Sequence, residues 1–297
     1  MSSAGALPAS ATRSRVASDQ PRVDGWALLL VPGLAFLVLA FGLPLLGMIA
    51  RSLTDPSPAT YAEVFQTRTF LTSMGYTLEL GVIVTLACLI LGYPWAYLMY
   101  SASPAWRWVL AGMVILPFWS SLLVRTYAWS VLLRPSGVIN FVLVKLGLVH
   151  QPLALMGNTL GVAIGMTQIL LPFMVLPLFA VMSRMDPDLV PAAQGLGARP
   201  TTAFVRVFLP LTLPGIAAGS VLVFVVALGF YITPTVLGNA RSPMFSQHIV
   251  NQTSVLLDFG LASALAVVLL IVTVLLIYTG SRFASLGEAL GFQERRI

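Results

Sequence analysis

Residues 189–215 read LVPAAQGLGARPTTAFVRVFLPLTLPG and lie between two long apolar segments of the chain. Small residues follow a fixed spacing within this stretch. Gly197 comes four residues after Ala193, the second member of an alanine pair with Ala192, and the run 207–210 begins ten residues after that glycine. Small side chains let the surface of another protein approach the backbone closely. The pattern therefore predicts a loop that seats in a groove of a partner.

The segments on either side of this loop are too apolar for a soluble protein. The 297 residues are 58% hydrophobic and 9% charged, with a mean hydropathy of +0.93, whereas soluble domains carry roughly 25% charged residues. A helix needs about 20 apolar residues to cross a bilayer, and backbone groups in lipid must pair within their own segment. We therefore predict an all-α integral membrane protein with six transmembrane helices at 26–50, 77–100, 108–133, 158–182, 215–237 and 261–280.

The basic residues indicate the orientation of these helices. The net charge is +6, which raises the question of a nucleic-acid partner. With the N-terminus inside, ten arginines lie on the cytoplasmic side and five basic residues on the outer side, as the positive-inside rule requires. The charge is therefore a signal of topology, and no nucleic acid is expected. Both termini are expected to be cytoplasmic.

The loop itself has helix signals. A short helix is predicted over 188–196, because Asp188 can accept backbone N–H bonds at its start and Gly197 suits a left-handed C-cap. Pro200 is expected to start a second helix. Pro210 and Pro214 are expected to interrupt that helix before the fifth span.

The spacing of the loop resembles a known motif. Type I ABC importer permeases carry E-A-A-x3-G-x9-I-x-L-P in the cytoplasmic loop that meets their ATPase. This chain matches the motif at Ala192, Ala193, Gly197, Leu209 and Pro210, and has Pro191 where the family usually has glutamate. The proline cannot make the polar contact of that glutamate, so the resemblance implies docking through shape and apolar contact.

A second block narrows the resemblance. Residues 116–140 read LPFWSSLLVRTYAWSVLLRPSGVIN, and the second span ends in LGYPWAYLMY. Both are similar to the spermidine/putrescine branch of these permeases, and the resemblance covers residues 26–282. It implies the type I ABC importer permease fold in the bacterial inner membrane. It also implies a pore shared with a second permease subunit, a pair of ABC ATPase subunits and a periplasmic substrate-binding protein.

The resemblance assigns the loop the task of ATPase coupling. There is no G-x-x-x-x-G-K-[ST] sequence, so we expect no cofactor in this chain and ATP hydrolysis by the partner subunit. No catalytic residue and no metal site are expected, since His150 and His248 are far apart in sequence. The expected coupling residues are Asp188, Leu189, Pro191, Ala192, Ala193, Leu196, Gly197, Leu209 and Pro210.

The expected domain organisation follows from the spans. Residues 1–24 are expected to be a disordered cytoplasmic tail, and residues 25–76 the first transmembrane helix with an external segment, in which 61–65 form a short helix. Residues 77–282 form the permease core of five transmembrane helices, with the coupling loop at 184–214. Residues 283–297 form a cytoplasmic tail.

Ionisable and aromatic side chains within the spans are candidates for the substrate pathway. Glu79 either faces the pathway and attracts a cation, or pairs with Arg125 and holds two helices together. Aromatic rings bind ammonium groups through their faces, although they also serve as belt residues that face lipid. Pro234 is expected to kink the fifth span, either as a gate or for packing alone. The pathway candidates are Glu79, Arg125, Trp119, Tyr127, Trp129, Tyr231 and Pro234.

Other small residues within the spans are expected to serve packing. The pairs Gly161/Gly165 and Gly215/Gly219 let backbones approach closely, and contacts within this subunit are favoured over contacts with a partner. Cys88 is expected to be a small apolar packing residue.

The expected function is a permease subunit of an ATP-driven importer for a small solute, a polyamine such as spermidine or putrescine. One alternative is an importer permease for another small organic or inorganic solute. An alternative of another class is a stand-alone secondary transporter or channel, although such carriers often show more buried acidic groups. A membrane enzyme would need an acid–base pair, nucleophile motif or metal cluster at membrane depth, and the spans contain no such pattern.

Overall fold

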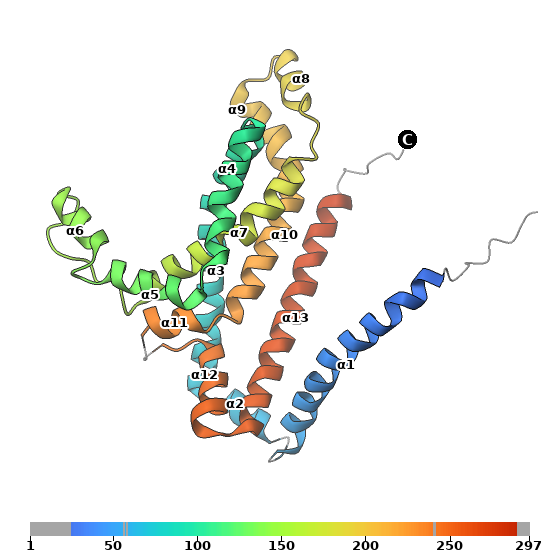
Figure 1. Cartoon of the computed structure of the whole chain (residues 1–297), viewed down its shortest axis with the longest axis vertical. Helices are drawn as coiled ribbons and strands as arrows, with labels where there is room; N and C mark the ends of the chain where they lie inside the picture. Colours follow the sequence, from blue (N-terminus) through green and yellow to red (C-terminus); the bar gives the residue numbers. More distant parts are fainter. Residues whose placement is uncertain (1–24, 56, 58, 240–241, 290–297) are drawn as a thin grey trace, which may run out of the picture. The chain divides into compact units, whose positions relative to one another are not determined.

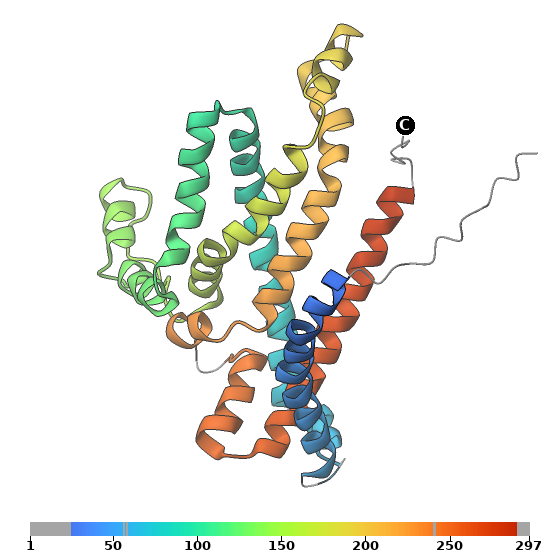
Figure 2. The same ribbon diagram turned by 45° about the vertical axis from the view of Figure 1, so that its right-hand side comes forward.

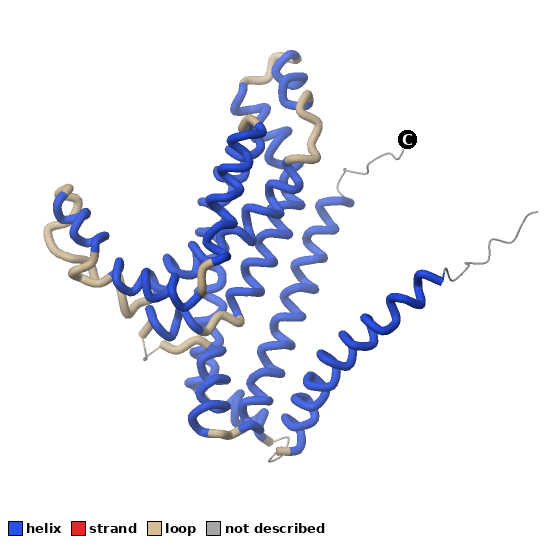
Figure 3. The backbone as a smooth tube through the Cα atoms, in the orientation of Figure 1, coloured by secondary structure: helices blue, strands red, loops and turns tan. Residues whose placement is uncertain are grey.

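The computed structural model describes residues 25–55, 57, 59–239 and 242–289. Within these residues it contains helices and loops and no strand, as Figure 3 shows. Six of its segments are long and apolar enough to cross a membrane, which confirms the predicted all-α architecture with six spans. Residues 1–24, the expected tail, lie outside the described residues.

The chain divides into two units, residues 1–47 and 48–297. The described part of the first unit belongs to helix α1 (Gly25–Thr54), which contains Pro32 and Pro44. The second unit holds the remaining elements (Figures 1 and 2). They are α2 (Thr60–Gln66), α3 (Arg68–Ser101), α4 (Pro104–Ile115), the 3₁₀ turn η1 (Leu116–Trp119), α5 (Leu122–Leu133), α6 (Val138–Lys145), α7 (Thr159–Met182), α8 (Leu189–Gly195), α9 (Pro200–Ala203), the π-helical turn η2 (Phe204–Phe208), α10 (Leu209–Leu228), α11 (Ile232–Leu237), α12 (Phe245–Asn251), the π-helical turn η3 (Gln252–Leu256) and α13 (Phe259–Ala289).

Helix α7 is the centre of the second unit and packs against α3 and α10. Glycines make this close approach possible. A Cβ atom on Gly219 of α10 would lie 3.2 Å from the carbonyl oxygen of Met174, and one on Gly215 would lie 3.2 Å from the Cα of Leu178. A side chain on Gly165 of α7 would collide with Leu237. These contacts confirm that the glycine pairs pack within this subunit.

Cys88 of α3 is fully buried, and its thiol lies 3.6 Å from the carbonyl oxygen of Thr167 in α7. This confirms its packing role. Asn158 lies at the N-cap of α7 and accepts a hydrogen bond from the N–H of Gly161 at 3.0 Å. The fourth span therefore begins and ends where the sequence predicts.

The second span is longer than predicted and begins at Arg68 rather than at Thr77. The segment before it contains α2, which confirms the short helix expected over 61–65. Helix α13 likewise continues to Ala289, beyond the expected end at Gly280.

The third span is not one helix, and this part of the prediction is wrong. Helix α4 ends at Ile115, η1 follows, and the extended residue Ser120 precedes α5. Both the backbone N–H and the hydroxyl of Ser120 donate to the carbonyl oxygen of Pro117, at 3.1 and 2.7 Å. Serine side chains compete with the helix ladder in this way, so the chain turns at this point.

The prediction for the prolines of the fifth span is also wrong. The chain stays helical from Pro200 to Leu228, and Pro210 and Pro214 lie inside this segment without interrupting it. The π-helical turn η2, just before Pro210, changes the hydrogen-bond register there. The break occurs instead at Gly229–Tyr231.

Pro234 follows that break and lies in the first turn of α11. The predicted kink at this residue is therefore wrong. A proline in the first turn of a helix loses nothing, because the N–H groups of that turn have no intrahelical acceptor.

The second unit has two distinct ends in Figures 1 and 2. The α3–α4 turn and the loop with α8 and α9 lie at one end. Helices α2 and α12 lie at the opposite end. Helix α3 extends between these ends, so the loop is separated from α12 by the length of that helix.

We predict that Gly219→Val destabilises the protein by about 1–3 kcal/mol, because the added methyl groups push α10 away from the α7 backbone. The measurement is thermal unfolding of the detergent-purified protein. Gly112→Val is the matched control, since nothing lies within 4 Å of a Cβ atom at that position. Equal unfolding temperatures for the two variants would contradict the close packing of α7 and α10.

Candidate functional site

The helix of the loop, α8, has a turn stabilised by Asp186 before it and a cap at its C-terminal end. Asp186 accepts a hydrogen bond from the N–H of Asp188 at 2.9 Å and turns the chain into α8. Asp188 occupies the N-cap position, but its side chain makes no capping bond. The predicted side-chain cap by Asp188 is therefore wrong, and Asp186 stabilises the turn before the helix without capping it.

The C-terminal cap of α8 is as predicted. Gly197 has φ +90°, a left-handed conformation that side chains disfavour. The N–H of Gly197 donates to the carbonyl oxygen of Gln194 at 2.9 Å, and that of Ala198 donates to Ala193 at 3.1 Å. These two bonds form a Schellman motif, which ends the helix and fixes the direction of the chain after it.

Most of α8 is turned away from the core. Leu196 is 91% exposed and Leu189 is 39% exposed, and Pro191 and Ala192 are also exposed. Val190 is the residue that holds the helix, since it packs against the core of the second unit. Val190 was not among the predicted residues, although an apolar residue two positions before the alanine pair was a visible signal. The loop thus presents an apolar surface of small residues at the end of the bundle.

Two of the predicted coupling residues lie apart from this surface. Leu209 and Pro210 begin α10 and are partly buried there. Their side chains therefore belong to the helix that the loop leads into, while the other seven candidates form or flank α8.

The predicted pair of Glu79 and Arg125 does not form. Glu79 is exposed on α3, and within the part of the chain that the structure describes the ion pair formed is Arg51–Asp55. The Arg125 guanidinium lies 5.8 Å from the ring centre of Phe118, and its buried Nε has no hydrogen-bond partner among the described residues. The reading of the two residues as a helix-to-helix pair is therefore wrong.

The aromatic pathway candidates lie in two places: Trp119, Tyr127 and Trp129 belong to η1 and α5, and Tyr231 lies beside α11. Trp129 donates to Gln168 at 3.3 Å, while Trp119 and Tyr127 are 89% and 60% exposed. Tyr231 lines a hollow of about 370 Å³ with Gln247 and His248. The structure therefore does not gather the predicted residues into one site.

Helix α12 secures the break in the fifth span. Ser246 donates to the carbonyl oxygen of Phe230 at 2.6 Å, and the N–H of Phe245 donates to Thr77 of α3 at 2.8 Å. Gln247 donates to Thr235 of α11 at 3.1 Å. The first bond satisfies a carbonyl group that the break exposes, and the other two tie α12 to α3 and α11.

His248 adds a titratable group to the contact between α12 and α3. Its Nε2 lies 2.8 Å from the hydroxyl of Ser73, and its ring meets that of Phe70 edge-on at 5.3 Å. Burial lowers the pKa of His248 below its ordinary value of 6.5. The folded protein therefore favours the neutral ring.

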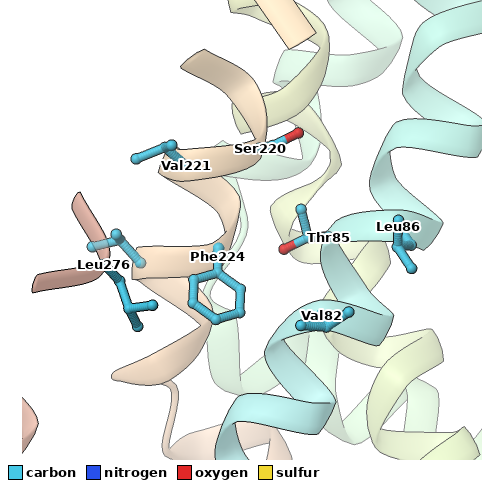
Figure 4. A pocket seen from close by; sticks show the side chains of 8 residues that line it. Val82, Thr85, Leu86, Ser220, Val221, Phe224 and Leu276 are labelled. Carbon is cyan, nitrogen blue, oxygen red and sulfur yellow. The ribbon is translucent and has the colours of Figure 1, made fainter. Parts of the chain in front are cut away.

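A second hollow of about 240 Å³ lies between α3, α10 and α13, and Figure 4 shows the side chains around it. Val82, Phe224 and Leu276 make most of its wall apolar. The Thr85 hydroxyl donates to the carbonyl oxygen of Gly81 at 2.7 Å, so that it is already satisfied. Such a wall suits hydrocarbon better than a charged solute, because its apolar side chains cannot replace the hydrogen bonds that a charged group makes with water.

A bundle of membrane-spanning helices with a capped, exposed helix at one end has the architecture of a transport permease. Residues 92–284 match the family described as the binding-protein-dependent transport system inner membrane component. The chain belongs to this family. It is a multi-pass inner membrane protein and a permease subunit of an ABC importer, and the family consists of transport permeases rather than enzymes.

Relatives support this assignment. The spermidine/putrescine transport system permease protein PotB of Haemophilus influenzae is 36% identical over 202 residues, which cover 68% of this chain and 71% of that protein. The inner membrane ABC transporter permease protein YdcU of Escherichia coli is 41% identical over 177 residues, covering 54% of this chain and 56% of YdcU.

Solved structures share the fold. A chain of a bacterial alginate ABC transporter, in complex with an alginate pentasaccharide-bound periplasmic protein, superposes with a TM-score of 0.70 at 19% identity. The match covers 87% of this chain and 93% of that one. The inward-facing methionine ABC transporter MetNI gives a TM-score of 0.57 at 15% identity, covering 74% and 96%. The type I permease fold expected from the resemblance is confirmed.

We predict that the protein loses stability as the pH falls below 6.5. The unfolded chain then takes up a proton at His248 that the folded chain resists until its lower pKa is reached, so protonation favours unfolding. The measurement compares thermal unfolding at about pH 8 and about pH 5.5. His248→Gln keeps a polar group beside Ser73 but cannot titrate, so it should show a smaller loss. An identical loss in both proteins would assign the pH effect to other groups.

Proposed function

We propose that this chain is the permease subunit of an importer for polyamines such as spermidine and putrescine. In this proposal the solute arrives on a periplasmic binding protein, and the chain shares the pathway with a second permease subunit. ABC ATPase subunits dock on the α8 loop and supply the energy, and this chain binds no nucleotide or other cofactor. The name of PotB, which is 36% identical, supports the substrate class.

The observation that carries the coupling assignment is the form of α8. The cap at its C-terminus fixes the end of this short helix without burying it, and α8 exposes small and apolar side chains to a partner. Pro191 is in the first turn of that helix and leaves the surface without the usual acidic group. Docking therefore rests on close contact at Ala192, Ala193 and Gly197.

The proposed orientation places the α8 end and both chain termini in the cytoplasm, in agreement with the distribution of arginines. Helix α12 then lies at the periplasmic end, where the binding protein docks. Closure of the ATPase pair pushes on α8 and rocks the permease helices between inward-facing and outward-facing states. Tyr231 and Pro234, next to the break between α10 and α11, lie where a gate could open without breaking a continuous helix.

We predict that Ala192→Trp abolishes capture of the ATPase and ATP-driven transport, while the variant still inserts into the membrane. The indole would hold the partner's surface away from α8. Co-purification with the ATPase and uptake into proteoliposomes measure the two effects. Gly197→Trp should give the same loss, but it also strains a residue with positive φ, so Ala192→Trp is the cleaner variant.

The matched control is Ala62→Trp, which adds the same ring to an exposed alanine of α2 at the opposite end. That variant should capture the ATPase normally. Wild-type capture and transport by Ala192→Trp would overturn the coupling assignment. Uptake by the isolated chain without any ATPase would instead support a stand-alone transporter.

We predict that Glu79→Gln lowers spermidine uptake about fivefold, because one charge contact with an ammonium group near the surface is worth about 1 kcal/mol. Glu79 is exposed on α3 and is not neutralised by Arg125, so its charge is available to a cation. Glu79→Asp keeps the charge and should transport normally. Normal uptake by Glu79→Gln would remove this residue from the pathway.

One observation favours another solute. The Arg125 guanidinium has a buried Nε with no hydrogen-bond partner among the described residues, and it would repel a polyamine while attracting an anionic group. The second candidate is therefore an importer for a small solute that carries a carboxylate or phosphate. Titration of the cognate binding protein with spermidine and with such anions distinguishes the candidates, since each predicts binding of its own class alone.

A further inference from the structure

The π-helical turn η2, which joins the α8 loop to the membrane bundle, has fewer regular hydrogen bonds than a continuous α-helix. In η2 the N–H of Leu209 donates to the carbonyl oxygen of Phe204, five residues back, instead of to the residue four back. Pro210 then has no N–H to donate. Fewer regular bonds therefore join α9 to α10 here than in a continuous α-helix. A push on α8 would bend the chain at η2 unless another element held that turn.

A cluster of five rings holds η2 from the side. We call this cluster the aromatic pad; it consists of Tyr93, Tyr97 and Tyr100 of α3 with Phe204 and Phe208 of η2. Phe204 and Phe208 stack at 5.4 Å, and Tyr97 meets both of them edge-on, at 5.6 and 5.3 Å. Tyr93 also meets Phe204 edge-on at 6.3 Å. Tyr100 also lies 5.5 Å from Phe208. Tyr97 is therefore the ring of α3 that contacts both phenylalanines of η2.

A hydrogen bond extends this attachment to the first turn of α10. The Thr212 hydroxyl donates to the carbonyl oxygen of Leu209 at 2.8 Å, so it accepts a hydrogen bond from the Tyr93 hydroxyl, which lies 3.2 Å away. Thr212 is fully buried. The α3 side of the pad is thus connected both to η2 and to the helix that follows.

The end of α3 is fixed in turn by Arg107 of α4. Its guanidinium donates to the carbonyl oxygens of Met99 and Tyr100, at 3.2 and 3.3 Å, and lies 5.7 Å from the ring centre of Phe179 in α7. A cation at a helix C-terminus also stabilises the helix dipole. The pad therefore has a firm base, since α3 cannot swing away from α4 and α7.

We infer that the aromatic pad transmits the motion of α8 into the bundle, with Tyr97 as its positioning residue. The push passes sideways from η2 into α3, and does not depend on the weakened helical connection to α10 alone. This inference rests on the proposed coupling role of α8. Tyr97 acts through the two phenylalanines that it contacts.

If Tyr97 served only to pack the core, its removal would impair folding. Phe208 is 2% exposed, so its truncation would open a cavity in the core, whereas Tyr97 is 40% exposed and its loss leaves no sealed cavity. Tyr97→Leu therefore removes the two edge-on contacts of Tyr97 with little effect on folding, while the contacts of Tyr93 and Tyr100 with η2 remain. Tyr97→Phe keeps the ring and loses only the hydroxyl.

The experiment uses the complete transporter, reconstituted in liposomes with its ATPase, second permease and binding protein. It measures solute taken up per ATP hydrolysed. For Tyr97→Leu we expect this ratio to fall about tenfold, the size of two lost ring pairs, with ATPase capture and hydrolysis retained. Tyr97→Phe should restore the wild-type ratio. Phe65→Leu, which removes an exposed ring of α2 outside the pad, should not change it.

A second readout asks whether the rings act as one unit. If they do, adding Phe204→Leu to Tyr97→Leu should lower the ratio no further than either change alone. A wild-type ratio for Tyr97→Leu would overturn the role of the pad, and equal loss of uptake and hydrolysis would show a merely structural role. Ala192→Trp distinguishes the coupling role of α8 from the role of the aromatic pad. Normal transport by Ala192→Trp would refute the coupling role of α8. Lost transport by Ala192→Trp together with a wild-type ratio for Tyr97→Leu would refute the role of the pad alone.

Discussion

Backbone groups within the spans must find partners in the protein, because lipid offers none. The long helices satisfy this requirement by themselves, and each interruption satisfies it through a particular side chain. Ser120 donates to the carbonyl oxygen of Pro117 where the third span turns, and Ser246 does so for Phe230 where the fifth span breaks. Irregular backbone is therefore affordable only where neighbouring residues complete its hydrogen bonds.

The need to satisfy backbone groups divides the molecule into a closely packed centre and irregular elements around it. The glycine contacts of α7 with α10 and the buried contacts of α3 make a tightly packed centre. The short or irregular elements lie outside this centre. They are α8 at one end of the second unit, η2 between α9 and α10, and the break between α10 and α11. We propose that ATP-driven motion enters at α8 and is conducted by side chains, since the backbone is least regular at the points where it must move.

The sequence predicted what depends on local chemistry. Hydropathy located six spans, and the spacing of Ala192, Ala193 and Gly197 located α8 and its left-handed cap. It did not predict features set by contacts between distant residues, such as the split third span or a helix that runs through Pro210. The sequence also suggested a pair between Glu79 and Arg125 from similar depth alone, but side-chain direction depends on how α3 and α5 are rotated. Val190 and the aromatic pad were missed for the same reason.

Hydrogen–deuterium exchange can show directly whether the α8 loop contacts the ATPase. The amides of residues 184–199 would be measured in the permease with and without its partner ATPase. We expect slower exchange in this loop when the ATPase binds, because α8 is exposed on its own and becomes enclosed in the complex, while α2 at the opposite end exchanges as before. Unchanged exchange at α8 in an assembled, ATP-hydrolysing complex would contradict the assignment of this loop as the connection to the ATPase.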